Sequence, residues 1–189
     1  MSFIESIEKI DRDLFLSLNA CHSPFFDQVM EAVSQTFIWI PLYLFVLFLI
    51  YRKLKWQVLA ILPVFILGVV LSDQISVYAF KEVFERFRPC HNLDLVDLVH
   101  TVNGKCGGKF GFVSSHAANT FMFAALSSLF IRKKWFIILI FFWAVLVSYS
   151  RIYLGVHYPG DVFFGAVLGL VIGVGVFYLY TFIYKKIKA

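Results

Sequence analysis

The sequence predicts an all-α fold: a polytopic membrane helix bundle of about five transmembrane helices, preceded by an N-terminal interfacial helix. Two observations lead to this expectation. Of the 189 residues, 60% are hydrophobic and only 15% are charged, against about 45–50% and about 25% in soluble domains. The apolar residues also gather in five runs that are long enough, or nearly long enough, to cross a bilayer. A chain of this length has too little interior to bury so many apolar side chains in water.

The first segment, residues 1–20, predicts an amphipathic helix that lies in the membrane interface, because apolar residues recur in it at helical spacing. Acidic residues break any signal-peptide core and give the helix an acidic polar face, which suits an outer leaflet. Ser23 and Pro24 are typical of an N-cap and the first residue of the next helix. The apolar positions of the first segment are Phe3, Ile4, Ile7, Ile10, Leu14 and Leu18.

The remaining apolar runs predict the membrane spans, within one membrane domain that covers residues 1–189. We expect the helix of the second apolar run, which begins at Gln57, to continue to about Arg88, where Pro89 ends it. Gly165, Gly169 and Gly173 recur every fourth residue in the last run, which predicts close packing against another helix. The five runs are Thr36–Tyr51, Gln57–Phe80, Ala117–Ile131, Trp135–Tyr149 and Val162–Tyr184.

The charges between the runs predict the topology. Three short segments are basic and contain no acidic residue, and the positive-inside rule places them in the cytoplasm together with the C-terminus. The N-terminus, the outer loop region 81–115 and the loop 151–160 then share the outer face. The net charge of +5 is therefore a topology signal, and we expect no nucleic-acid partner. The basic residues are Arg52, Lys53, Lys55, Arg132, Lys133, Lys134, Lys185, Lys186 and Lys188.

Three groups of residues on the predicted outer face are candidates for catalysis or ligand binding. Lys81 and Arg88 are seven residues apart, so a continuous helix would present both cations on one face. His116 follows two serines at the start of the third run, where free N–H groups and the helix dipole favour an anion. Near the start of the last run, the carboxylate of Asp161 could orient the imidazole of His157.

Together with Arg151, these groups give three cations, two histidines and one aspartate on one face. Such a cluster suits a phosphoryl group, whose transfer depends mainly on charge stabilisation and positioning. We expect no metal, because no acidic cluster accompanies the histidines and the cations would repel a divalent ion.

The same residues resemble the three-part signature of the type 2 phosphatidic acid phosphatase (PAP2) family, which is related to bacterial acid phosphatases and vanadium haloperoxidases. The resemblance covers roughly residues 20–185. It departs from the family pattern in the second motif, where Val113 and Ser115 replace the usual Pro and Gly. The matching stretches are Lys81-x6-Arg88-Pro89, Ser114-Ser115-His116 and Ser150-Arg151-x5-His157-x3-Asp161.

The resemblance implies a metal-independent phosphatase that needs no cofactor and works through a phosphohistidine intermediate. His157 would be the nucleophile, Asp161 would hold its imidazole, and His116 would protonate the leaving oxygen. The phosphate would be bound by Lys81, Arg88, Ser114, Ser115 and Arg151.

The resemblance also implies a lipid phosphate or diphosphate substrate and a location in the bacterial inner (plasma) membrane, with the active site on the periplasmic or outer face. By analogy with short bacterial members, the expected substrate is a polyprenyl (undecaprenyl) diphosphate. Lipid A, phosphatidylglycerol phosphate and phosphatidic acid are alternatives within this class. A non-catalytic lipid-binding membrane protein is an alternative of a different class, and a haloperoxidase is disfavoured because those enzymes are generally larger and soluble.

Cys90 and Cys106 in the outer region are expected to form a disulfide in an oxidising compartment.

Overall fold

The computed structural model describes residues 3–188, and those residues form helices and loops with no strand. Some predictions concern residues or side chains outside the described part. They are the side of the membrane on which residues 1, 2 and 189 lie, and the place of the Phe3 and Ile4 side chains on the apolar face of the first helix. A π-helical stretch, Ile75–Lys81, joins two of the helices. The helices are α1 (Phe3–Asn19), α2 (Pro24–Ser34), α3 (Ile40–Leu54), α4 (Val58–Gln74), α5 (Glu82–Phe84), α6 (Ser115–Ile131), α7 (Lys134–Tyr153) and α8 (Pro159–Lys188).

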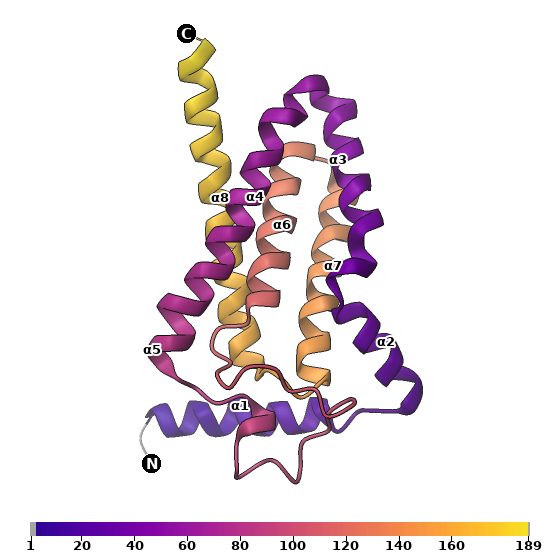
Figure 1. Cartoon of the computed structure of the whole chain (residues 1–189), viewed down its shortest axis with the longest axis vertical. Coiled ribbons are helices and arrows are strands. Elements are labelled where there is room, and N and C mark those ends of the chain that lie inside the picture. The colour runs from indigo at the N-terminus through magenta and orange to yellow at the C-terminus, as the bar shows by residue number, and fades with distance from the viewer. Residues whose placement is uncertain (1–2, 189) are drawn as a thin grey trace.

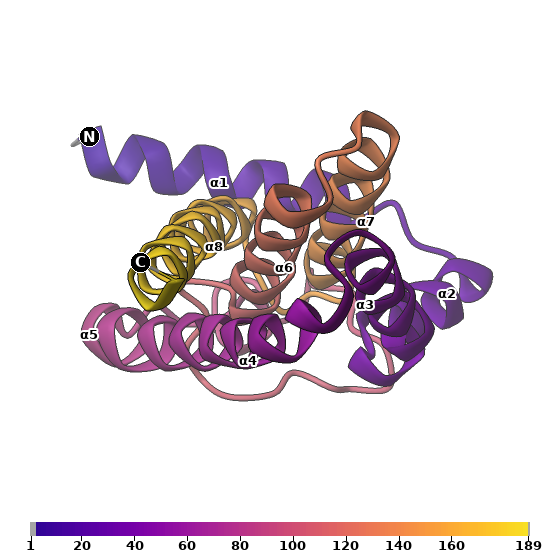
Figure 2. The same ribbon diagram turned by 90° about the horizontal axis from the view of Figure 1, so that it is seen from above.

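The long helices form an upright bundle, and α1 runs across one end of it (Figure 1). Seen from above, α6 lies in the middle and packs against α8, α7 and α4 (Figure 2). Its central place fits its sequence, because small residues such as Ala118, Ala124 and Ala125 are buried along it and let neighbouring helices approach closely.

Within residues 3–188, three helical stretches are long and apolar enough to cross a membrane: Thr36–Phe84, Lys134–Tyr153 and Pro159–Ile187. The first contains both α3 and α4, which are separated by a turn at Lys55, where φ is 53°. The predicted fold class, a membrane helix bundle, is confirmed, and the chain is an integral membrane protein. The number of five spans stays a prediction.

The three basic segments lie at the same end of the bundle, opposite α1 (Figure 1). One of their lysines also has a local role. The Lys53 ammonium donates to the carbonyl oxygens of Phe130 at 2.9 Å and Ile131 at 3.1 Å, so it neutralises the free carbonyls at the C-terminus of α6. The shared end agrees with the predicted topology, and the side of the membrane stays a prediction.

The glycine stripe packs α8 against α6 of the same chain, as the sequence predicts for close helix packing. A Cβ placed on Gly169 would lie 2.2 Å from the carbonyl oxygen of Ala118, and one on Gly173 would lie 2.7 Å from that of Met122. Real Cβ atoms do not approach backbone oxygens so closely. Only glycine therefore allows the observed distance between the two helices.

The predicted amphipathic helix exists as α1, and the predicted N-cap at Ser23 is confirmed. The last residue of α1, Asn19, is buried, with 1% of its surface exposed. Its amide group donates to the carbonyl oxygen of Tyr153 at 2.8 Å, and its carbonyl oxygen accepts from the backbone N–H of His100 at 2.8 Å. The helix is thus bonded to the last residue of α7 and to the loop at His100, which a simple membrane anchor would not need.

The prediction that the helix of the second apolar run, Gln57–Phe80, continues to Arg88 is wrong. Its helical part ends at Phe84, because Glu85 adopts a left-handed conformation with φ 45°. Beyond it, the carbonyl oxygen of Arg86 accepts from the N–H of Gly111 at 2.8 Å, and the N–H of Arg88 donates to Lys109 at 3.1 Å. The returning loop satisfies these backbone groups in place of helical bonds. Lys81 and Arg88 consequently do not share a helix face.

The predicted disulfide between Cys90 and Cys106 is confirmed, with Cα atoms 5.9 Å apart. It closes the loop that follows Arg88.

Candidate active site

The three motifs meet at the end of the bundle that α1 crosses. Lys81 ends the π-helical stretch, and Arg88 lies in the loop that follows. The second motif begins α6, Arg151 lies in the last turn of α7, and Asp161 lies in the first turn of α8. The structure therefore brings together segments that are up to 80 residues apart in the sequence.

His157 and Asp161 form a buried pair, with 2% and 0% of their side chains exposed. The imidazole Nδ1 lies 3.4 Å from the carboxylate Oδ2, which also accepts from the backbone N–H of Tyr158 at 3.0 Å. The loop reaches this position through Gly155, whose φ of 74° and contact with the His100 carbonyl exclude a side chain. With Nδ1 facing the carboxylate, Nε2 is the ring atom left for chemistry.

Burial lowers the pKa of His157 to about 4, against the opposing effect of Asp161 and with a further contribution from the charges of Arg88 and Arg151. The imidazole is therefore neutral at neutral pH. A neutral imidazole has a lone pair on Nε2, which a nucleophile requires.

The guanidinium of Arg88 is held by the loop that the disulfide closes. Its Nε donates to the carbonyl oxygen of Phe110 at 3.3 Å, and its Nη1 donates to that of Cys106 at 3.1 Å. Gly107, with φ 79°, lies against it, and a Cβ there would be 3.2 Å from Nη1. These contacts fix the position of the cation beside the His157–Asp161 pair.

The other two cations of the site, Arg151 and Lys81, extend from the end of α7 and from the end of the π-helical stretch. One guanidinium nitrogen of Arg151, Nη1, donates to the hydroxyl of Ser34, whereas its Nε is buried and has no hydrogen-bond partner within the described residues. A buried donor of this kind calls for an acceptor. The Lys81 ammonium donates to Ser115 Oγ at 2.6 Å, and that hydroxyl also bonds to Ser76 at 2.6 Å.

Ser114 is the N-cap of α6: it is buried, and its hydroxyl accepts from the N–H of Ala117 at 3.5 Å. Its own N–H donates to the backbone carbonyl of Asp161 at 2.9 Å. Ser115 follows in the first helical turn and has no positive φ. Replacing the family's glycine by serine therefore brings no backbone strain here.

His116 lies in the same first turn. The charges of Arg151, Arg88 and Lys81, and the imidazole of His157, are close enough to act on it electrostatically. The two histidines and the three cations expected from the sequence thus face one region. Within the described residues, no group of three or more His, Cys, Asp or Glu side chains could hold a metal ion.

Arg86 belongs to none of the sequence motifs, and its guanidinium contacts two carboxylates. Nη1 lies 2.8 Å from Asp161 Oδ1, and Nη2 lies 2.8 Å from Asp11 Oδ2 on α1. Its position two residues before Arg88 was the available signal. The partner on α1 could not be read from spacing.

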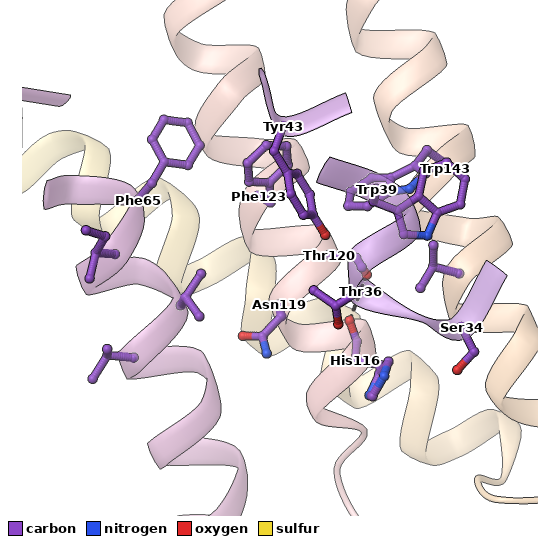
Figure 3. A pocket seen from close by; sticks show the side chains of 14 residues that line it. Ser34, Thr36, Trp39, Tyr43, Phe65, His116, Asn119, Thr120, Phe123 and Trp143 are labelled. Atoms are coloured by element: carbon purple, nitrogen blue, oxygen red, sulfur yellow. Dashed lines mark hydrogen bonds between the residues drawn. The ribbon is translucent and has the colours of Figure 1, made fainter. Parts of the chain in front are cut away.

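A cavity of about 390 Å³ extends from His116 into the bundle between α3, α4, α6 and α7 (Figure 3). Its end near His116 is polar, with Ser34, Thr36, Asn119 and Thr120, and its deeper part is aromatic, with Trp39, Tyr43, Phe65, Phe123 and Trp143. Asn119 Oδ1 is buried without a hydrogen-bond partner in the described residues. No sequence pattern predicted this cavity, although Asn119 lies one turn after His116 in an apolar run.

Comparisons with known proteins agree with this geometry. Residues 59–185 match the model of the PAP2 superfamily. The chain is 39% identical over 188 residues to a lipid A 4'-phosphatase of Bacteroides thetaiotaomicron, covering 98% of this chain and 82% of the relative. It is 38% identical over 180 residues to the lipid A 4'-phosphatase of Porphyromonas gingivalis, covering 95% and 76%.

The fold has solved counterparts as well. The crystal structure of a transmembrane PAP2 type phosphatidylglycerolphosphate phosphatase from Bacillus subtilis superposes with a TM-score of 0.67 at 26% identity, covering 96% of this chain and 88% of that one. The resemblance of the motifs, the match to the family model and the shared fold lead to one conclusion. This chain belongs to the PAP2 superfamily and is a membrane-embedded lipid phosphatase.

Proposed function

We propose that this protein hydrolyses a phosphomonoester of a lipid A-type glycolipid, without a metal and through a phosphohistidine intermediate. The similarity to two proteins named lipid A 4'-phosphatase, which extends over nearly the whole chain, carries this proposal. The substrate expected from the sequence was a polyprenyl diphosphate, by analogy with short bacterial members. The relatives support the lipid A alternative better, so we adopt it here.

The first step is the attack of His157 Nε2 on phosphorus. The bond between phosphorus and the sugar oxygen breaks, and His116 gives a proton to that oxygen. His116 holds this proton when the negative charge of the bound phosphate offsets the charges of Arg151, Arg88 and Lys81 around it. Asp161 holds the attacking imidazole through Nδ1, at the observed 3.4 Å. In the second step a water gives its proton to His116 and attacks the phosphohistidine, which releases inorganic phosphate and restores both histidines.

The phosphate oxygens bind to Lys81, Arg88 and Arg151 in this proposal. The unpartnered Nε of Arg151 supports it most directly, because a phosphate oxygen would supply the missing acceptor. Ser115 contributes through its hydroxyl, which Lys81 already contacts. Ser114, which the resemblance also implies in phosphate binding, is buried as the N-cap and fixes the position of the first N–H groups of α6.

The cavity beside His116 receives the lipid portion next to the phosphate. Its polar end suits a sugar or an ester, and its aromatic depth suits hydrocarbon. The site then lies on the periplasmic face of a bacterial inner membrane, with the C-terminus in the cytoplasm. The gathering of the basic segments at the opposite end supports this orientation.

The test measures phosphate release by the purified protein in detergent, with EDTA present, from lipid A, undecaprenyl diphosphate, phosphatidylglycerol phosphate and phosphatidic acid. We expect the highest kcat/KM on lipid A and one phosphate lost per molecule, measured by mass spectrometry. His157→Ala should abolish turnover, whereas His22→Ala, at an exposed site, should retain it.

Each part of the proposal has its own contrary result. A higher kcat/KM on undecaprenyl diphosphate would restore the polyprenyl substrate. Loss of activity in EDTA would overturn the metal-free mechanism, and full activity of His157→Ala would remove the nucleophile. Lipid binding without release from any substrate would favour the non-catalytic alternative.

A further inference from the structure

Arg86 differs from the other cations of the site in what it contacts. Both of its terminal nitrogens are engaged by carboxylates at 2.8 Å, from Asp161 on α8 and from Asp11 on α1. Its guanidinium carbon also lies 4.2 Å from the ring centroid of Tyr158, so the plane is held against an aromatic face. A guanidinium occupied in this way has little capacity left for a phosphate.

The contact with Asp161 restricts how that carboxylate can turn. Oδ1 is bound by Arg86, whereas Oδ2 accepts from the Tyr158 N–H and faces His157. Each oxygen thus has its own partners, and rotation of the carboxylate would break contacts on both sides. Asp161 is fully buried, where an ionised carboxylate without a cation is costly.

The contact with Asp11 ties the same guanidinium to α1. The other oxygen of Asp11, Oδ1, accepts from the N–H of Gly160 at 2.7 Å, in the first turn of α8. Asp11 therefore bridges Arg86 and the backbone that carries Asp161. A lysine could not reproduce this arrangement, because its single nitrogen cannot match the fork of a guanidinium.

We propose that Arg86 is a positioning residue of the phosphatase: it fixes the Asp161 carboxylate that orients His157, and Asp11 of the N-terminal helix completes the clamp. This inference rests on the proposed function, since it assigns Arg86 a part in the same reaction. Arg86 acts through Asp161 and does not touch the substrate.

The role predicts a fall in kcat with little change in KM. For Arg86→Gln we expect kcat to fall ~10–100-fold, the range for removing an outer residue that orients a functional side chain, and KM to change by less than ~3-fold. Arg86→Lys should lose nearly as much. Asp11→Asn should lose ~2–10-fold, because Arg86 keeps its contact with Asp161. The matched controls Arg12→Gln and Asp13→Asn, neighbours of Asp11 on α1, should keep wild-type kcat.

A double-mutant cycle separates positioning from an independent effect. If Arg86 acts through Asp161, Arg86→Gln should slow Asp161→Asn by less than ~3-fold, although it slows the wild type far more. Multiplicative losses in the double variant would overturn the proposal. A raised KM with unchanged kcat in Arg86→Gln would overturn it too, since that pattern indicates phosphate binding.

The folding of each variant is checked by size-exclusion chromatography in detergent. If Arg86→Gln does not fold, the comparison of Asp11→Asn with Asp13→Asn carries the test, and equal kcat in this pair overturns the clamp. A wild-type protein that releases no phosphate from any lipid refutes the proposed function instead. An active wild type with an equally active Arg86→Gln refutes only this inference.

Discussion

The packing of α8 on α6 allows a sharp comparison between two glycines of one helix. At Gly169, a Cβ would lie 2.2 Å from the carbonyl oxygen of Ala118 and 2.8 Å from the N–H nitrogen of Met122, both on the backbone of α6. At Gly175, a Cβ would meet nothing within 4 Å. The variants Gly169→Ala and Gly175→Ala therefore add the same methyl group to the same helix in opposite environments.

The expected magnitude follows from the contact distances. The added methyl group at position 169 is more than about 1 Å too close to a backbone oxygen, which cannot rotate away as a side chain could. Overpacking of this kind costs ~1–3 kcal/mol. Both variants gain ~1 kcal/mol of helix propensity over glycine, and this gain cancels in the comparison. We expect Gly169→Ala to be less stable than Gly175→Ala by the overpacking cost alone.

The assay is the apparent melting temperature in detergent, together with kcat. For a protein of this size, ~1–3 kcal/mol lowers the melting temperature by roughly 2–4 °C per kcal/mol. Ala118 lies two residues after His116, so pushing α6 away also displaces that histidine, and a shift of ~1 Å can cost ~100-fold in rate. Equal melting temperatures and equal kcat in the two variants would refute the packing argument.

Three further outcomes are expected. Because the pKa of His157 falls to about 4 on folding, against about 6.5 in an unfolded chain, the unfolded chain binds more protons between these values. Stability should therefore fall as the pH drops from 6.5 to 4, and kcat/KM should decline in the same direction with a limb near 4; a limb near 6.5 in the pH–rate profile would contradict the burial argument. Replacing Cys90 and Cys106 by serine opens a loop with a sequence separation of 16 and should cost ~3 kcal/mol, seen as a lower melting temperature; unchanged melting would show that the bond does not constrain the loop. Lys53→Met removes two hydrogen bonds to the end of α6 and should lower the melting temperature while kcat stays unchanged, whereas a lowered kcat would connect that end of α6 to the site.

The sequence predicted those parts of the site that depend on local pattern. Asp161 follows His157 by four residues, which is one turn, and Ser114 precedes an apolar helix that it caps; both relations depend on nearby residues. The glycine stripe of α8 is equally local, because its spacing marks one helix face. The disulfide was predictable from compartment and position, since both cysteines lie in one outer loop.

The parts that failed depend on distant residues. The continuation of the second helix to Arg88 looked favourable by composition, but the loop at Gly111 captures the carbonyl of Arg86 and the helix ends at Phe84. Arg86 gained its importance from Asp11, which is 75 residues away. The cavity beside His116 is likewise lined by residues of α2, α3, α4, α6, α7 and the 3-10 helix Thr36–Trp39, and no single segment carries its pattern.

The bonds of α1 have a consequence for how this protein is made. Asn19 bonds to a carbonyl 134 residues later, and Asp11 bonds to an N–H 149 residues later. The ribosome synthesises α1 first, yet these two partners, Tyr153 at the end of α7 and Gly160 in the first turn of α8, emerge only near the end of the chain. During biogenesis α1 therefore cannot form these bonds until α7 and the start of α8 have been synthesised, and a shorter chain lacks a complete site. Phosphate release would then report that the whole chain has been inserted, because the contacts between α1 and the site form only after the hairpin of α7 and α8 has entered the membrane.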